Sequence, residues 1–292
     1  AGGRLFASTE DGKVYCFSSG TRPAPPPAPP APALQFSDDD TGRLCVATAD
    51  AVSAQSGVKR GYCLVLGCGT GRLAYELAKR TDLFILAVDS DPQTVADART
   101  RLSDAGVYGH RVTVEQCDLA AVPYSDYFAN LIVSETAATT GKLPPSAGEV
   151  LRMLKPCGGV VCLGQPDGAA GSLGAAGIRQ WLASGGIERD VKEESRQGVW
   201  CTYVRPALDG AGSWTHQYGT PGNTASSEDT VVKCPLGVLW YGSPGPDKVP
   251  SRHARNTAPL SINGRVYLQG TNLIMCFDAY NGVSYWEKEV QG

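Results

Sequence analysis

The sequence is poor in histidine, has no paired cysteines and contains no long hydrophobic run. Its three histidines, His110, His216 and His253, lack the spacing of metal ligands, and none of its ten cysteines belongs to a Cys-x-x-Cys pair. We therefore predict no metal site, and we interpret the cysteines as small buried hydrophobic residues rather than zinc ligands or disulfides. No apolar run reaches the roughly 18 residues that a membrane-spanning helix needs.

The net charge and the length of the chain limit which partners and how many domains are expected. The net charge is −3 and no basic cluster stands out, so nucleic-acid binding is not indicated. The 292 residues are enough for about two domains. The chain begins at Ala1 rather than methionine, and we expect a fragment or a processed product.

The stretch from Tyr62 to Ala74 organises the chain. A short apolar run, Cys63 to Leu66, has the length of a buried strand. Glycines follow at alternate positions, and apolar residues then recur at helical spacing. Strand, glycine turn and helix together predict a corner that binds a phosphate or a nucleoside, because glycine lets a ligand approach the backbone closely.

Spacing separates the possible ligands. A dinucleotide fingerprint would place its third glycine at Arg72, and a P-loop would need a lysine that is absent. A second apolar run, Leu83 to Val88, ends in Asp89, about 20 residues past the glycines, where an acid suits the two hydroxyls of a ribose. The alternative for the glycines is a tight turn in some other α/β sheet. The alternative for Asp89 is that it caps the next helix.

This pattern resembles the class I S-adenosylmethionine-dependent methyltransferases. The resemblance runs in family order from about residue 45 to residue 206, and it includes a Leu-Lys-Pro-Gly-Gly-like turn into which Cys157 is inserted. It implies an α/β Rossmann-like domain over 38–206, with a seven-stranded sheet that ends in an antiparallel hairpin. It also implies S-adenosylmethionine as the cofactor.

The pattern from 38 to 206 alternates between helices and strands, which indicates a parallel sheet covered on both faces. We expect helices over 38–57, 73–78, 92–105, 149–154 and 178–183, and strands over 63–66, 83–88, 111–115, 130–134, 160–163, 188–193 and 199–204.

The resemblance also implies a set of site residues. Asp89 would bind the ribose, Asp118 would accept from the adenine amino group, and the Leu119 amide would donate to a ring nitrogen. Glu135 is a candidate general base or amine-orienting group; the alternatives are a solvated loop for Asp118 and a surface carboxylate for Glu135. The cofactor-binding residues predicted in this way are Gly67, Cys68, Gly69, Thr70, Gly71, Asp89, Ser90, Asp118, Leu119 and Ser134.

The two flanks differ from this domain. Residues 1–20 predict a hairpin around an Asp-Gly turn, residues 21–37 form a Pro/Ala-rich linker, and residues 207–292 predict a β-meander with Asn-Gly turns. Asp-Ala-Tyr-Asn-Gly followed by Trp286 is similar to the quinoprotein-type (PQQ-like) β-propeller repeat, and the opening hairpin resembles the middle of the same repeat. Both flanks would then be all-β propeller-type blade segments around an inserted domain.

About two blades fit into the flanks, whereas a propeller needs at least about four, so we expect further blades from missing sequence or another chain. The absence of an adjacent Cys-Cys pair disfavours a quinone dehydrogenase.

The sequence thus predicts methyl transfer to an unidentified acceptor, a small molecule or a protein, with the propeller segments as scaffold or recruiter. The alternative is a non-catalytic propeller scaffold that carries a degenerate nucleoside-binding domain. The cofactor favours the cytoplasm, while the propeller resemblance leaves the periplasm open.

Overall fold

The computed structural model describes residues 4–9, 14–18, 36–243, 248–249 and 257–290. The chain divides into two compact units, Ala1–Pro32 and Ala33–Gly292. In the first unit, β1 (Leu5–Ser8) and β2 (Val14–Phe17) pair antiparallel, which confirms the predicted hairpin strands. The predicted linker over 21–37 lies outside the described residues except for its last two positions.

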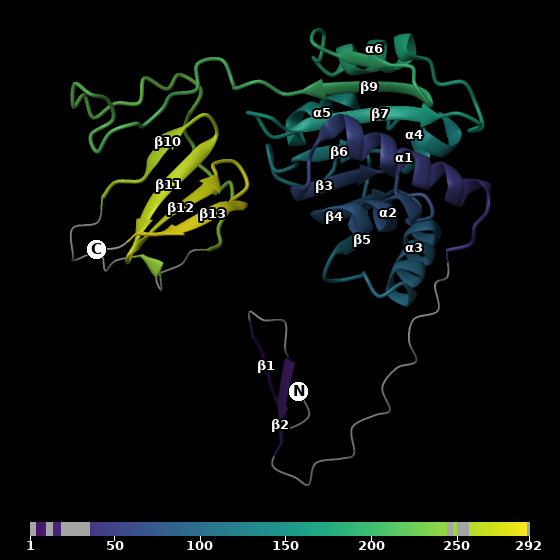
Figure 1. The fold of residues 1–292 in the computed structure, drawn as a ribbon, viewed down its shortest axis with the longest axis horizontal. Coiled ribbons are helices and arrows are strands. Elements are labelled where there is room, and N and C mark those ends of the chain that lie inside the picture. Colours follow the sequence, from purple (N-terminus) through teal and green to yellow (C-terminus); the bar gives the residue numbers. More distant parts are fainter. Residues whose placement is uncertain (1–3, 10–13, 19–35, 244–247, 250–256, 291–292) are drawn as a thin grey trace. The chain divides into compact units, whose positions relative to one another are not determined.

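The second unit contains a seven-stranded sheet in the order β5-β4-β3-β6-β7-β9-β8 (Figure 1). The strands β3 to β7 run parallel to one another, whereas β9 is antiparallel to β7 and β8 is antiparallel to β9. The predicted mixed sheet with a terminal antiparallel hairpin is therefore confirmed. The strands are β3 (Arg60–Leu66), β4 (Asp82–Asp89), β5 (Val112–Gln116), β6 (Leu131–Val133), β7 (Val160–Pro166), β8 (Lys192–Glu194) and β9 (Gly198–Val204).

Helices cover both faces of this sheet (Figure 1). Alternate residues of β3 enter two cores: Cys63 and Val65 pack with α1, α2 and α3, while Leu64 and Leu66 pack with α5 and α6. Because both faces are covered, the central strands carry apolar runs such as Cys63 to Leu66 instead of an alternating pattern. The helices are α1 (Asp40–Ser56), α2 (Arg72–Arg80), α3 (Pro92–Asp104), α4 (Glu135–Thr140), α5 (Ala147–Met153) and α6 (Ala175–Ser184).

Side-chain caps fix where several helices begin. Asp91 caps α3 by accepting from the Thr94 amide at 2.9 Å, and Pro92 follows at the first helical position, as the sequence predicts. The helix α4 was not predicted, although Ser134 caps it and Gly141 ends it in a left-handed conformation. Among the described helices, none is long and apolar enough to cross a membrane.

The C-terminal strands form a separate four-stranded antiparallel sheet in the order β10-β11-β12-β13, which confirms the predicted meander. Its strands are β10 (Leu260–Ile262), β11 (Arg265–Gly270), β12 (Leu273–Asp278) and β13 (Ser284–Glu289). No strand occurs in the described part of 207–259, so the described flanks contain this sheet and the β1-β2 pair. The described residues close neither a propeller nor a barrel.

Buried polar contacts join this sheet to the Rossmann-like domain at the amino ends of the parallel strands. Lys155, just before β7, lies 2.7 Å from Asp278, and both side chains are almost fully buried. The side-chain amide of Asn281 donates to the Phe128 carbonyl at 2.7 Å and to the Asn130 side chain at 2.8 Å, just before β6. The connection is therefore built from side chains that have no access to water.

Candidate functional site

The residues predicted to bind the cofactor come from four strands that end at one edge of the sheet. β3 pairs with both β4 and β6, and β4 pairs with β5, all parallel, so their carboxyl ends lie side by side. Gly67, Asp89 and Ser134 directly follow or end three of these strands, and Asp118 lies two residues past the fourth. Ligands of open α/β sheets bind at this edge.

The glycine loop is held against protein rather than against open space. Gly67 and Gly69 have φ values of +71° and +50°, which favour glycine. A Cβ on Gly69 would lie 2.7 Å from Glu135 Oε1, and one on Gly67 would collide with Thr136. The glycines at these positions thus let the start of α4 approach the loop, a use that the sequence did not indicate.

Most backbone amides of this loop are already bonded inside the protein. Gly67 and Cys68 both donate to the Val88 carbonyl, at 2.9 and 3.0 Å. A phosphate-binding loop needs free amides that point at the ligand. The further amides with a partner within the protein are those of Thr70, Gly71, Arg72 and Leu73. The loop is therefore poorly suited to cradle a phosphate.

The Glu135 carboxylate accepts hydrogen bonds from two of these amides, those of Thr70 and Leu73. One carboxylate oxygen accepts from the Thr70 amide and hydroxyl, both at 2.6 Å, and the other accepts from the Leu73 amide at 2.8 Å. The side chain is only 1% exposed. Burial raises the pKa of Glu135 to about 7, and the hydrogen bonds from Thr70 and Leu73 oppose that rise. Glu135 is thus not a surface carboxylate, and it is bonded to the loop rather than turned to an open site.

Asp89, the predicted ribose ligand, lies at the carboxyl end of β4 and does not cap the helix that follows. Its Oδ1 accepts from the Asp91 amide at 3.2 Å, while the cap of α3 is made by Asp91 itself. The alternative that Asp89 caps this helix is therefore wrong. Asp89 is 9% exposed at the carboxyl end of β4, and its carbonyl accepts from the Cys117 amide, which ties it to the segment containing Asp118.

The segment after β5 carries the predicted adenine contacts. Asp118 is exposed, and one of its carboxylate oxygens accepts from the Ala120 amide at 2.8 Å, which shapes the loop. Leu119 is half-buried against the second core. Ser90 is exposed, and its carbonyl accepts from the Gln116 side chain. These residues lie beside Asp89, and their ligand contacts stay a prediction.

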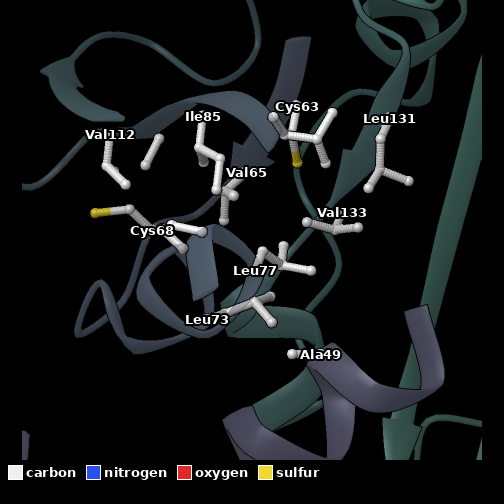
Figure 2. Packing of buried hydrophobic residues seen from close by; sticks show 14 of the residues in the cluster. Ala49, Cys63, Val65, Cys68, Leu73, Leu77, Ile85, Val112, Leu131 and Val133 are labelled. Carbon is white, nitrogen blue, oxygen red and sulfur yellow. The ribbon is translucent and has the colours of Figure 1, made fainter. Parts of the chain in front are cut away.

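Two predicted site residues turn their side chains into the protein. Figure 2 shows Cys68 among the packed side chains of the first core, with Leu73 and Val112, and it is fully buried. Burial raises the pKa of its thiol, which keeps it protonated. Ser134 is 4% exposed, and its hydroxyl accepts from the Ala137 amide at 3.1 Å as the cap of α4. Neither side chain is turned to an open site, and the Cys68 amide is itself bonded to the Val88 carbonyl.

A small cavity beside the loop was not predicted. It has a volume of about 150 Å³ and is lined by Thr70, Arg72 and Arg101 together with residues at the start of α1. No sequence signal pointed to Arg101, because only the packing of α3 against Gly71 brings it to the loop. Among the described residues, no group of three or more His, Cys, Asp or Glu side chains is arranged to hold a metal ion.

Comparison with known proteins agrees with this geometry. Residues 63–158 match the family described as methyltransferase domain. This part of the chain has a Rossmann-like methyltransferase fold. The family match implies S-adenosylmethionine as its cofactor, and the loop amides, which are bonded within the protein, fit a nucleoside that has no phosphate.

Individual relatives are distant. The methyltransferase domain is similar to the uncharacterized methyltransferase YodH of Bacillus subtilis, with 31% identity over 93 residues, 32% of this chain. The chain spans 38% of the length of that relative. Among solved structures, an S-adenosylmethionine-dependent methyltransferase from Aquifex aeolicus is 20% identical with a TM-score of 0.45, over 56% of this chain and 94% of that one. The [4+2]-cyclase SpnF is 19% identical with a TM-score of 0.44, over 56% and 82%.

Proposed function

We propose that the protein transfers a methyl group from S-adenosylmethionine to an acceptor that is still unidentified. The observation that carries this proposal is the pairing of Asp89, which is free of any capping role, with a glycine loop whose amides are bonded within the protein. An acid at the end of β4 selects a ribose, and the loop offers little to a phosphate.

S-adenosylmethionine, when bound, supplies a methyl group on a positively charged sulfur that a nucleophile can attack in line. The chain's own residues contribute position. Asp89 would hold the ribose hydroxyls, Asp118 and the Leu119 amide would orient the adenine, and the loop from Gly67 to Gly71 would support the methionine part. The Glu135 carboxylate beneath the loop would place negative potential near the sulfonium.

Two features support a second function, a non-catalytic nucleoside-binding domain. The Ser134 hydroxyl is used as a helix cap, and Glu135 is bonded to the loop, so neither is free to take a proton from an acceptor. An acceptor that is already nucleophilic needs no such base, and methyl transfer to it requires mainly positioning.

For the C-terminal sheet we propose a bracing role rather than recruitment of the acceptor. Its contacts lie just before β6 and β7, whereas the cofactor residues follow the opposite ends of the strands. A strand the length of β3 spans roughly 20 Å. That the sheet is one blade of a propeller completed by another segment or chain stays a proposal, supported by the repeat-like sequence around Asp278.

Calorimetric titration with S-adenosylhomocysteine tests the proposed cofactor site. We expect binding by the wild-type chain and a loss of roughly 10- to 100-fold in affinity for Asp89→Ala, because charged hydrogen bonds contribute about 1.5–3 kcal/mol. Asp97→Ala removes an exposed carboxylate on α3 and should leave the affinity unchanged. A folded wild-type chain without affinity would refute the cofactor proposal.

If binding is established, incubation with methyl-labelled cofactor and candidate acceptors separates the two functions. Label transferred to a small molecule or protein supports an enzyme. Binding of the cofactor without transfer to any acceptor class would favour the non-catalytic domain.

A further inference from the structure

The positive end of α2 is occupied by a carboxylate that belongs to the protein itself. The first amides of a helix lack partners within the helix and carry partial positive charge, and they commonly bind phosphate. Here Gly71 precedes α2 and provides no side-chain cap. Glu135, from a different helix, fills this position by accepting from the amides of Thr70 and Leu73.

Several contacts fix Glu135 in this position. It directly follows the cap residue of α4, and the Thr136 amide donates to the Gly67 carbonyl at 3.3 Å. The Thr139 hydroxyl donates to the Glu135 carbonyl at 2.8 Å. The absence of a Cβ at Gly69 allows the carboxylate to lie this close to the loop. These contacts fix the backbone of Glu135, and the hydrogen bonds from Thr70 and Leu73 hold its carboxylate at the start of α2.

We propose that Glu135 is a specificity-determining residue that keeps phosphate groups away from the N-terminus of α2, so that the site accepts nucleosides without phosphate. A phosphate near Thr70 would meet amides that are already bonded and a like charge within a few ångströms. The inference rests on the proposed function, since it explains why this α/β corner would take S-adenosylmethionine rather than a nucleotide.

Several charged and titratable groups lie around this point. Burial raises the pKa of Glu135 to about 7, so its carboxylate is mainly ionised at pH 8, and Arg101 favours the ionised form. The buried thiols of Cys45 and Cys68 also lie near it. Arg101 also lines the cavity beside Thr70. Removing Glu135 would therefore leave unpaired amides and an arginine around the vacated space, which is a favourable setting for an anion.

The test measures the melting temperature of the full chain in phosphate and in chloride at equal ionic strength and pH 8. Phosphate should raise the melting temperature of Glu135→Ala by roughly 2–4 °C for each kcal/mol of binding free energy. Phosphate should also weaken the affinity of this variant for S-adenosylhomocysteine. The wild type should show neither effect. Glu135→Gln is the matched comparison: its amide fills the same space but lacks the charge and can accept through only one atom, so it should respond to phosphate less than Glu135→Ala.

Equal responses of the wild type and Glu135→Ala to phosphate, or no response in either, would overturn the proposal. If Glu135→Ala does not fold in chloride, recovery of folding in phosphate or formate supports it, and failure in every anion overturns it. Binding of S-adenosylhomocysteine by the wild type is measured separately, so a failure of the cofactor proposal can be told apart from a failure of this one.

Discussion

At the scale of single residues, Glu135 shows how burial changes what a carboxylate can do. A glutamate at the end of a strand is a reasonable candidate for a general base, yet here its oxygens bind Thr70 and Leu73. Three donors directed at one carboxylate hold the loop in a single conformation. The residue is better described as a positioning residue for the cofactor loop.

The stability of the protein should depend on the pH through Glu135. Its pKa rises from 4.5 to about 7 on folding, so between these values the folded state binds the proton that the unfolded state has lost. The contribution of Glu135 is therefore greatest below pH 4.5 and falls, by up to about 3 kcal/mol, as the pH rises through 7. Urea unfolding at a series of pH values, with Glu135→Gln as the reference, measures it; parallel curves for the two proteins would contradict this expectation.

The close approach at Gly69 can be separated from its unusual backbone angle. Gly69→Ala places a methyl group 2.7 Å from Glu135 Oε1, whereas Gly168→Ala, also at positive φ, meets no atom within 4 Å. Both changes carry backbone strain, but only the first also forces the carboxylate away. We expect Gly69→Ala to cost about 1–3 kcal/mol more in unfolding free energy than Gly168→Ala. Equal costs would mean that the loop moves freely away from α4.

At the scale of elements, the C-terminal sheet is connected through the turn between β12 and β13. Asp278 at the end of β12 binds both Lys155 and the Tyr285 hydroxyl, the latter at 2.6 Å. Asn281 in the turn reaches the carbonyl of Phe128. A turn that looks like a repeat signature in the sequence thus serves here as the contact with another domain.

Removing one member of the buried ion pair should be costly. Lys155→Met leaves the Asp278 carboxylate buried without its counter-charge, and we expect a loss of about 3–5 kcal/mol. Lys248→Met breaks an ion pair with Glu287 on the same sheet, but both side chains are well exposed, so the loss should stay below about 1 kcal/mol. Chemical denaturation of both variants measures the difference, and similar losses would contradict a structural role for the buried pair.

At the scale of the whole molecule, the Rossmann-like domain and the C-terminal sheet form parts of one compact unit. Because their contacts are buried and polar, separating them leaves unpaired groups on both sides. The two parts of the second unit should therefore unfold together when the protein is heated.

Calorimetry tests this coupling. The wild type should show one main transition for residues 33–292, and Asp278→Asn, which weakens the contact with Lys155, should broaden or split it. Asp229→Asn alters a partly buried loop carboxylate away from this contact and should not. Two separate transitions in the wild type would show that the sheet is not coupled to the domain.

Much of the secondary structure could be predicted from short patterns in the sequence. Apolar runs fixed β3 and β4, Asp91-Pro92 fixed the start of α3, and Asn-Gly turns fixed the C-terminal meander. The helix α4 was not predicted because it is too short to show helical periodicity, although Ser134 and Gly141 mark its ends. That the flanks are propeller blades stays a prediction, because a four-stranded meander and a strand pair do not by themselves define a propeller.

The sequence by itself determined the order of strands and helices and the acid that follows β4, because both depend on local periodicity and spacing. Tertiary structure decided that Glu135 rather than a ligand fills the N-terminus of α2, and that Cys68 faces the core. It also decided that Lys155 meets Asp278 at the far edge of the sheet. These contacts join residues far apart in the chain, and only packing in three dimensions brings such groups together and sets the cost of burying their charges.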